Sequence, residues 1–195
     1  MKQKKWEDHY SRKAKKEDFP ARSVYKLKEI QKKYRIIKRG DLVLDLGCSP
    51  GSWLLYASEL AGPEGFVVGV DLKPVQIELP ANVKVITGNI SEQGGGLLKP
   101  LEKKYNIILS DMAPATTGRK DLDAYRSFSL CTSALEIARD FLMQGGCFVC
   151  KIFQGQDFKM FSDDIKKMFK MQKNFKPQSS RKTSKEIYVI GIGRI

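Results

Sequence analysis

An α/β fold, in which helices cover both faces of a mostly parallel sheet, is the fold class that the sequence predicts. Short apolar runs typical of buried strands alternate along the 195 residues with segments whose apolar side chains recur at helical spacing. The first apolar run ends in a turn of small residues that leads directly into a helical pattern. Strands that alternate with helices are joined by crossover connections, which make neighbouring strands parallel.

The chain begins with a strongly charged segment. Residues 1–20 lack apolar periodicity, and we expect a loosely held basic N-terminal arm there, with a short helix. Residues 21–195 are expected to form a single domain, because 42% apolar residues suffice for one sizeable core. The first element of this domain is a helix after Ser23 with four apolar side chains on one face: Val24, Leu27, Ile30 and Tyr34.

Strands and helices then alternate to the end of the chain. Apolar runs predict strands over residues 42–46, 65–70, 83–87, 105–110, 147–153 and 186–192. Helical spacing predicts helices over residues 53–60, 97–103, 123–143 and 157–169. Gly145 and Gly146 are expected to end the third of these helices. Sheets of this kind bind ligands beyond the carboxyl ends of their strands.

The turn after the first predicted strand has the features of a nucleotide site. Asp45 and Gly47 end the strand and Gly51 precedes the helix, so backbone N–H groups in this turn can approach a ligand closely. Asp71 ends the second strand, twenty residues after Gly51. A carboxylate at that distance is placed to accept hydrogen bonds from ribose hydroxyls.

The details of the turn favour S-adenosylmethionine as the cofactor. The turn has Ser49 at the position of the middle glycine of a dinucleotide fingerprint, and no Lys-Ser/Thr pair of a P-loop follows it. The carboxylate of Asp45 is unfavourable beside a pyrophosphate but suits a ligand with a cationic, amino-bearing tail. We therefore expect S-adenosylmethionine rather than NAD, and the alternative is a tight turn that binds no ligand.

The four cysteines do not predict a metal site. Cys147 and Cys150 have the spacing of a zinc-ligand pair, but a single distant histidine, His9, cannot complete a tetrahedral set. We expect buried, reduced thiols and no metal. The chain has neither an apolar run of about 18 residues nor an apolar N-terminal signal region, so a cytoplasmic protein without membrane contact is expected.

The net charge of +13 is unevenly distributed. Residues 1–39 carry fifteen Lys/Arg against five Asp/Glu, and residues 159–185 carry nine against two. Residues 40–158 carry ten against fourteen and are therefore mildly acidic. Two basic segments on either side of an acidic centre indicate binding to a polyanion such as RNA, because each phosphate contact releases counterions.

Polar residues stand where the predicted strands end or where burial is expected. Asp111 follows strand 105–110, and Lys151 lies among the apolar residues of strand 147–153. A buried lysine needs a partner or a function, so Lys151 is either a functional group or half of a structural ion pair with Asp111. Glu186 begins the last predicted strand and Lys26 lies in the first helix, where each by itself would be taken for a surface charge.

Five motifs in order resemble the FtsJ-type ribosomal RNA 2′-O-ribose methyltransferases, from about Asp8 to Arg194. They are Arg22-Ser-Val-Tyr-Lys-Leu-Lys-Glu-Ile, Asp45-Leu-Gly-Cys-Ser-Pro-Gly-Ser-Trp, Ser110-Asp-Met-Ala-Pro, Gly145-Gly-Cys-Phe-Val-Cys-Lys-Ile-Phe-Gln-Gly and Ser179-Ser-Arg-Lys-Thr-Ser-Lys-Glu-Ile-Tyr. The resemblance implies a Rossmann-like S-adenosylmethionine-dependent fold with a seven-stranded sheet. It also implies a catalytic tetrad of Lys26, Asp111, Lys151 and Glu186, and cofactor contacts from Gly51, Trp53, Asp71 and Asp111.

The chain departs from this family at two positions. Ser52 stands where the family has a second glycine, and Asn89 stands where an Asp contacts the adenine amino group. Asn89 can still accept that hydrogen bond through its carbonyl oxygen. Asp45 and Gly47 complete the set of expected cofactor residues.

The resemblance also implies the acceptor, a ribose 2′-hydroxyl of a uridine in large-subunit ribosomal RNA. The run Asp111-Met-Ala-Pro lacks the aromatic platform used to methylate base amines, and no cysteine lies there for methylation at carbon 5. Alternatives are a 2′-O-methyltransferase acting on tRNA or an mRNA cap, and an RNA-binding ribosome assembly factor without activity. RNA or the large subunit is expected to contact segments 1–39 and 159–185 of a monomer.

Overall fold

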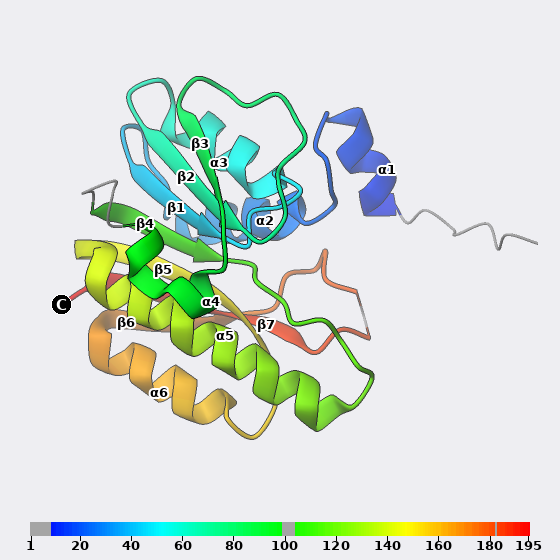
Figure 1. Cartoon of the computed structure of the whole chain (residues 1–195), viewed down its shortest axis with the longest axis vertical. Helices are drawn as coiled ribbons and strands as arrows, with labels where there is room; N and C mark the ends of the chain where they lie inside the picture. Colours follow the sequence, from blue (N-terminus) through cyan, green and yellow to red (C-terminus); the bar gives the residue numbers. More distant parts are fainter. Residues whose placement is uncertain (1–8, 99–103, 182) are drawn as a thin grey trace, which may run out of the picture.

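A seven-stranded sheet with the order β3-β2-β1-β4-β5-β7-β6 forms the centre of the computed structural model, which describes residues 9–98, 104–181 and 183–195 (Figure 1). The five strands β1 to β5 are parallel to one another, and β7 runs antiparallel between β5 and β6. Their bounds are β1 Leu42–Leu46, β2 Phe66–Asp71, β3 Val83–Thr87, β4 Tyr105–Ser110, β5 Leu142–Phe153, β6 Phe169–Phe175 and β7 Glu186–Arg194. The predicted α/β class and its mostly parallel sheet are confirmed.

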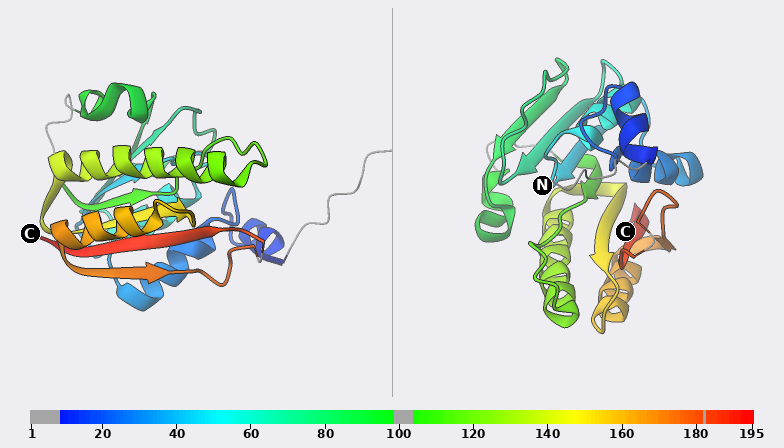
Figure 2. Two further views of the ribbon diagram at one scale, coloured as in Figure 1. Left: turned by 90° about the horizontal axis from the view of Figure 1, so that it is seen from below. Right: turned by 90° about the vertical axis from the view of Figure 1, so that its right-hand side faces the viewer.

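Helices cover both faces of the sheet, as Figures 1 and 2 show. One face packs against α5 and α6, whose buried residues include Leu135 and Phe161. The other face packs against α2 and α3, which contribute Leu27 and Leu54. The helix bounds are α1 His9–Lys16, α2 Val24–Tyr34, α3 Ser52–Ala61, α4 Ile90–Gln93, α5 Lys120–Phe141 and α6 Phe158–Met168, and a short 3₁₀ helix, η1, spans Gly94–Leu97. None of the helices within the described ranges is both long and apolar enough to cross a membrane.

The described part of the N-terminal segment packs against the domain. Ala14 on α1 and Phe19 after it are buried in a small apolar cluster with Val24 and Tyr25 of α2. Lys28 lies over the ring of Phe19, 4.3 Å from its centroid, and its Nζ is 2.6 Å from Glu17 Oε2. These contacts attach α1 to the start of α2, from which Lys26 projects.

Two predicted bounds are wrong, namely the end of α5 and the start of β5. Helix α5 ends at Phe141 rather than at the glycine pair, because Leu142 is already extended while its N–H still donates to Ala138 O. Leu142 pairs with Tyr105 as the first residue of β5. Gly146 is required there for a different reason, since a Cβ on it would lie 2.7 Å from the carbonyl oxygen of Asn106 on β4. Gly146 therefore serves the pairing of two strands, and neither glycine stops the helix.

The pattern of residues predicted six strands, and the edge strand β6 was not among them. The helix expected over residues 97–103 is not found in its described part, since Leu97 ends η1, and residues 99–103 lie outside the described residues. The remaining predicted strands and helices agree with the structure to within a few residues.

Candidate functional site

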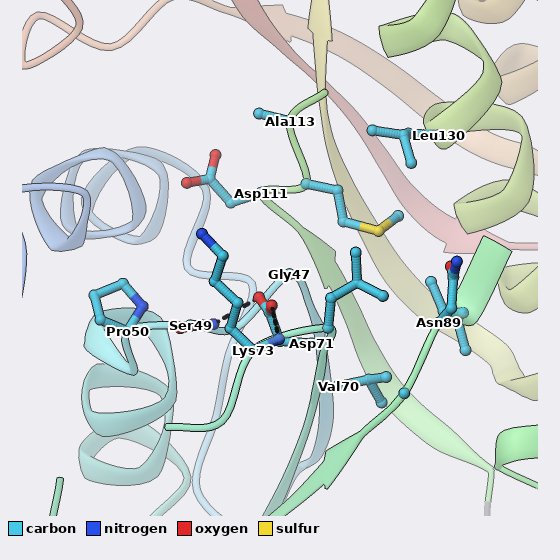
Figure 3. A pocket seen from close by; sticks show the side chains of 14 residues that line it. Gly47, Ser49, Pro50, Val70, Asp71, Lys73, Asn89, Asp111, Ala113 and Leu130 are labelled. Atoms are coloured by element: carbon cyan, nitrogen blue, oxygen red, sulfur yellow. Dashed lines mark hydrogen bonds between the residues drawn. The ribbon is translucent and has the colours of Figure 1, made fainter. Parts of the chain in front are cut away.

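A cavity of about 550 Å³ opens at the carboxyl ends of β1, β2 and β4 (Figure 3). This is the position expected for a ligand in an open parallel sheet. Its walls come from four loops that follow strands, and from α5. The lining residues are Gly47, Ser49, Pro50, Val70, Asp71, Leu72, Lys73, Gly88, Asn89, Ile90, Asp111, Met112, Ala113 and Leu130.

The glycines of the turn after β1 allow close packing. Gly47 has a φ of +81°, and a Cβ on it would lie 2.9 Å from the backbone nitrogen of Met112. The turn can therefore lie directly against the segment that follows β4. Gly51, with a φ of +111°, is close to Ile77, whose Cδ1 would be 2.6 Å from a Cβ. Gly51 thus allows the chain after β2 to cross the start of α3, and it does not line the cavity.

Asp71 is held rigidly at the edge of the cavity. Its Oδ2 accepts a hydrogen bond from the N–H of Ser49 at 2.9 Å, and its Oδ1 accepts one from the N–H of Lys73 at 2.8 Å. Figure 3 shows these two bonds and places Asn89 on another wall of the same cavity. Asp71 and Asn89 therefore both face the space in which a nucleoside would lie.

Asp45 is buried beneath the cavity. Its side chain is fully inaccessible, and neither carboxylate oxygen has a hydrogen-bond partner. Burial, followed by the negative charges of Asp111 and Asp71, raises the pKa of Asp45 well above its ordinary value. Such an unpaired buried carboxyl is unfavourable unless a cation approaches it. The three acids make the cavity suitable for a positively charged ligand, and S-adenosylmethionine, which has a sulfonium and an ammonium group, fits this requirement.

Trp53 lies under the site rather than in the cavity. It is 3% exposed, its indole Nε1–H donates to the carbonyl oxygen of Ser23 at 2.8 Å, and its ring lies 5.9 Å from that of Tyr188. Ser52 also connects α3 to the segment before α2. Its hydroxyl accepts a hydrogen bond from the N–H of Ala21 at 2.7 Å and donates one to the Ala21 carbonyl oxygen at 3.1 Å.

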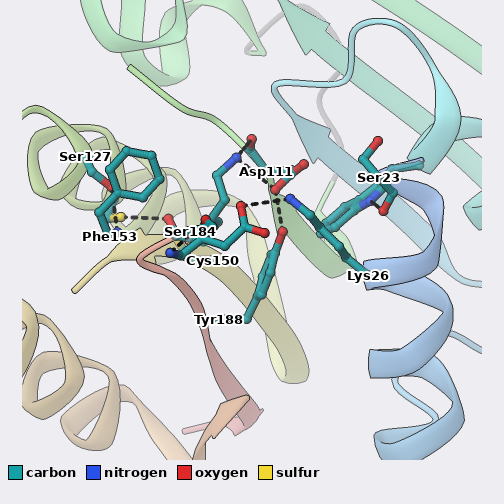
Figure 4. A network of polar contacts seen from close by, with 12 residues as sticks. Ser23, Lys26, Asp111, Ser127, Cys150, Phe153, Ser184 and Tyr188 are labelled. Carbon is teal, nitrogen blue, oxygen red and sulfur yellow. Dashed lines mark hydrogen bonds and ion pairs between the residues drawn. The ribbon is translucent and has the colours of Figure 1, made fainter. Parts of the chain in front are cut away.

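A network of charged and polar side chains borders the cavity at Asp111 (Figure 4). Lys151 Nζ lies 3.0 Å from Asp111 Oδ1, and it donates a hydrogen bond to the Asp111 carbonyl oxygen at 2.5 Å. The hydroxyl of Tyr188 donates to Asp111 Oδ1 at 2.6 Å. Lys151 and Tyr188 face each other across β5 and β7, and both are at most 5% exposed.

Lys26 and Glu186 form the second half of this network. Lys26 Nζ donates to Glu186 Oε2 at 2.9 Å and lies 6.0 Å from the centroid of the Tyr188 ring. Lys26 comes from α2, whereas Glu186 is the first residue of β7, two positions before Tyr188. All four residues of the predicted tetrad thus lie in one network that connects α2 with β4, β5 and β7.

Asp111 is an anion at neutral pH. Burial by itself would raise its pKa, but the charges of Lys151 and Lys26 and the hydrogen bonds from Tyr188 and Lys151 outweigh burial and lower the pKa. The residue therefore has a fixed negative charge between the cavity and the two lysines. It is the member of the network that also lines the cavity.

Two residues of the site were not selected from the sequence. Tyr188 follows Glu186 by two positions in a strand, so its side chain necessarily points to the same face, and this period of two was the available signal. Ser52 was noted only as a departure from a glycine. Its contact with Ala21, 31 positions away, leaves no local pattern in the sequence.

The cysteines lie away from this chemistry. Cys48, Cys131 and Cys150 are buried and Cys147 is half-buried, and none of the four forms a disulfide. Burial raises the pKa of Cys147 and of Cys150, which disfavours a reactive thiolate. Within residues 9–98, 104–181 and 183–195, no cluster of His, Cys, Asp and Glu is arranged to hold a metal ion.

Comparison with known proteins identifies the sequence family that shares these features. A profile of FtsJ-like methyltransferases matches residues 19–194. A protein of Desulforapulum autotrophicum named ribosomal RNA large subunit methyltransferase E is 56% identical, with 99% of this chain and 95% of that protein covered. A protein of the same name from Desulfatibacillum aliphaticivorans is 52% identical, with 95% of this chain and 90% of that protein covered.

Solved structures show the same fold. The crystal structure of a Plasmodium falciparum protein described as a ribosomal RNA methyltransferase is similar with a TM-score of 0.80 and 29% identity, covering 90% of this chain and 98% of that one. The fold is also that of Aeropyrum pernix fibrillarin, which was crystallised with natively bound S-adenosylmethionine. That match has a TM-score of 0.55 and 15% identity over 80% of this chain and 68% of the other.

Proposed function

This chain belongs to the FtsJ-like methyltransferase family, whose methyl donor is S-adenosylmethionine, and we propose from this premise that it methylates a ribose 2′-hydroxyl of large-subunit ribosomal RNA. The observation that carries the proposal is that Asp111 belongs to two neighbouring parts of the site. This residue lines the cavity at the carboxyl ends of the strands and also anchors the network of Lys151, Tyr188 and Lys26. A methyl donor on one side of it and a hydroxyl acceptor on the other would meet at this residue.

S-adenosylmethionine supplies, when bound, a methyl group that is already activated by the adjacent sulfonium. In this proposal Asp71 accepts hydrogen bonds from the ribose hydroxyls of the cofactor, and Asn89 accepts one from the adenine amino group. The turn at Gly47 lies against the methionine portion. The unpaired carboxyl of Asp45 beneath the cavity has a raised pKa, and a cationic ligand nearby would favour its ionised form.

The protein's own task is to hold the acceptor oxygen in line and to remove one proton. Lys151 is the proposed base, in which case it must be a neutral amine when the 2′-oxygen attacks, or it is the group that orients a lone pair of that oxygen. Asp111, which accepts a hydrogen bond from Tyr188, fixes the position of the Lys151 side-chain nitrogen at the mouth of the sheet. Lys26 is proposed to position the acceptor ribose or its phosphate, and Glu186 orients Lys26 through their 2.9 Å contact.

The proposed acceptor is RNA because of the charge distribution and the relatives. The basic segments 1–39 and 159–185 provide the cations that phosphates require. Both bacterial relatives named above are ribosomal RNA large subunit methyltransferases by name. The reaction would take place in the cytoplasm on the large subunit or its RNA. A protein that binds RNA without turnover is the second candidate, but it would not need the complete network of Lys26, Asp111, Lys151 and Glu186.

One experiment tests the reaction and the acceptor together. Positions of 2′-O-methylation are mapped in large-subunit ribosomal RNA from cells with and without this protein. One ribose methylation is expected to disappear when the protein is absent and to return when undermethylated subunits are incubated with the purified protein and S-adenosylmethionine. An unchanged map, with no transfer of a tritiated methyl group to those subunits, would contradict the proposed activity and favour the non-catalytic alternative.

A further inference from the structure

The strand that carries Lys151 extends past its parallel neighbour. The pairing of β4 with β5 ends at Ser110 and Cys150, whereas β5 continues through Lys151 to Phe153. On its other edge β5 stays paired with β7 to the last residue, where Phe153 lies opposite Glu186. Within the described residues, the end of β5 therefore pairs with a strand on one edge only.

The backbone groups of Lys151 and Phe153 point to the edge that β4 leaves. Backbone polar groups of alternate residues in a strand point to the same edge. The N–H of Gln154 donates to the carbonyl oxygen of Lys185 at 3.0 Å, on the side of β7. Lys151 and Phe153 therefore face the opposite edge. Buried backbone groups need hydrogen-bond partners, so a structure other than a strand must supply them at this edge.

Helix α5 supplies these partners from one of its faces. Ser127 Oγ accepts a hydrogen bond from the N–H of Phe153 at 3.0 Å, and Figure 4 shows the two residues side by side. The thiol of Cys131, one helical turn later, donates to the carbonyl oxygen of Lys151 at 3.1 Å. The thiol of Cys150 is a more distant donor to the same oxygen, at 3.7 Å. Both α5 side chains are 1% exposed, and they take the place of the strand partner that β4 no longer provides.

The same helix holds the loop that begins at Asp111. Asp123, in the first turn of α5, accepts hydrogen bonds at its Oδ1 from the N–H of Thr117 at 2.8 Å and from the Thr117 hydroxyl at 2.9 Å. Asp111 and Lys151 are in contact where this loop and the end of β5 meet. Helix α5 therefore fixes the two chain segments that carry these residues relative to each other.

We propose that Ser127 and Cys131 are positioning residues that set where the Lys151 side-chain nitrogen lies relative to the acceptor hydroxyl. The inference rests on the proposed function, since that function makes Lys151 the group that acts on the 2′-oxygen. Neither residue lines the cofactor cavity or takes part in the chemistry, and both act only on the backbone of β5. Loss of either contact lets the end of the strand shift, and a displacement of about 1 Å at a reacting group can lower a rate by about 100-fold.

The experiment compares two variants that lose a contact with two that do not. Ser127→Ala removes the acceptor for the N–H of Phe153, and Cys131→Val removes the thiol donor but keeps a side chain of similar size. Cys131→Ser keeps a donor at the same place. The matched control is Thr132→Val, which removes a hydroxyl of the same helix that donates to the carbonyl oxygen of Phe128 at 3.1 Å. Thermal midpoints and affinities for S-adenosylmethionine are measured, and methyl transfer to undermethylated large subunits is followed well below the midpoints.

Ser127→Ala and Cys131→Val are expected to lower kcat by about 10- to 100-fold. KM for the subunits and the affinity for S-adenosylmethionine should stay within about twofold of wild type, because the lost contacts act on the reacting group and not on binding. Cys131→Ser should keep kcat within about threefold of wild type, and Thr132→Val should behave as wild type. The proposal is overturned if folded Ser127→Ala and Cys131→Val keep the kcat of wild type, if only KM changes, or if Cys131→Ser loses as much kcat as Cys131→Val.

Hydrogen exchange separates this test from the test of the proposed function. The amide of Phe153 should exchange about 10-fold faster or more in Ser127→Ala than in wild type, because its local protection is lost. The amide of Val149, in the part of β5 that pairs with β4, should keep its rate. An unchanged rate at Phe153 would show that Ser127 does not hold the strand and would overturn the proposal. Because exchange needs no turnover, a wild-type protein without methyl transfer would contradict the proposed function and leave the exchange result valid.

Discussion

Lys151 makes two contacts with the same residue, Asp111. Its Nζ lies 3.0 Å from Oδ1 of the carboxylate and 2.5 Å from the backbone carbonyl oxygen. The double contact prevents the ammonium group from rotating away, although the lysine side chain has four rotatable bonds. The sequence left open whether Lys151 only forms a structural ion pair with Asp111. Because Asp111 lines the cavity, this ion pair also holds Lys151 beside it. Activity measurements separate the structural role from the functional one.

Lys151→Ala is the direct test of the proposed base. Proton transfer by a positioned group contributes about 10²–10⁴ in rate, so turnover is expected to fall by at least about 100-fold. Affinity for S-adenosylmethionine, measured by calorimetry, should be nearly unchanged, because Lys151 does not line the cofactor cavity. Lys84→Ala, which removes an exposed lysine of β3 outside the cofactor cavity, is the control.

Loss of one partner from a buried ion pair also destabilises a protein, by about 3–5 kcal/mol. The thermal midpoint of Lys151→Ala is therefore measured, and rates are compared well below it. Near-normal turnover in a folded variant would remove Lys151 from the mechanism and leave it a structural role only.

Tyr188→Phe should raise the pKa of Asp111 and lower the free energy of unfolding in a way that depends on pH. The Tyr188 hydrogen bond is one cause of the lowered pKa of Asp111. A carboxyl whose folded pKa is lowered stabilises the protein above its ordinary value of 3.8, and this stabilisation is lost as the pH falls through the folded pKa. Removing the hydroxyl raises the folded pKa, so the variant should be less stable than wild type at pH 7 by about 1.5–3 kcal/mol. The difference in unfolding free energy should shrink below pH 3.8, and a difference independent of pH would contradict this account.

Asp45→Asn should change the stability of the protein with the opposite dependence on pH. The pKa of Asp45 is raised, so its contribution is favourable below the ordinary value of 3.8 and is lost as the pH rises through the folded pKa. Asn does not titrate, so the thermal midpoint of the variant should gain on that of wild type as the pH rises above 3.8. The same substitution should weaken S-adenosylmethionine binding, since it removes the carboxyl that a cationic ligand would help to ionise. If the thermal midpoints of the two proteins depend on pH in the same way, ionisation of Asp45 does not destabilise the wild type.

The sheet could be predicted wherever strands are buried on both faces. The runs at β1, β2 and β4 are apolar because helices cover both of their faces, and no other element gives such a pattern at that length. Strand β6 was missed because it is an edge strand that pairs only with β7. Lys170 and Lys173 on it are exposed, and charged residues of this kind protect an edge while they obscure its pattern.

The sequence pattern predicted the site residues that stand at strand ends. It did not predict those that are placed by contacts between distant parts of the chain. Asp71 and Asp111 were identified because parallel strands bring their carboxyl ends to one edge. Glu186 and Lys26 resembled surface charges, and only the family resemblance selected them. Their 2.9 Å contact joins residues 160 positions apart, which no local pattern encodes. The hydrogen bonds of Ser52 to Ala21 belong to the same class of contact.

Ser52→Gly tests whether that serine positions Lys26, which belongs to the second half of the network. The serine hydroxyl pairs both polar groups of Ala21, and their loss should destabilise the fold by about 1–3 kcal/mol. Because Ala21 precedes the helix that carries Lys26, kcat should also fall, while affinity for S-adenosylmethionine stays unchanged.

The matched control for Ser52→Gly is Ser58→Ala, at the far end of α3. Its hydroxyl donates to Asn82 Oδ1 at 2.6 Å, so the variant loses a comparable hydrogen bond away from α2. It should lose stability and retain kcat. If both variants keep full kcat at temperatures where they are folded, Ser52 has a structural role alone.

Neutralising the lysines of α1 should reveal whether the N-terminal segment binds RNA. Lys13, Lys15 and Lys16 are exposed on this helix, which packs against α2 through Ala14. Replacing all three by Gln should weaken RNA binding and reduce the salt slope by about 0.7 for each phosphate contact that is lost. S-adenosylmethionine binding should not change, because these residues do not line its cavity. A slope equal to that of wild type would mean that the three charges only face solvent, and the proposed RNA surface would then be confined to the rest of segment 1–39 and segment 159–185.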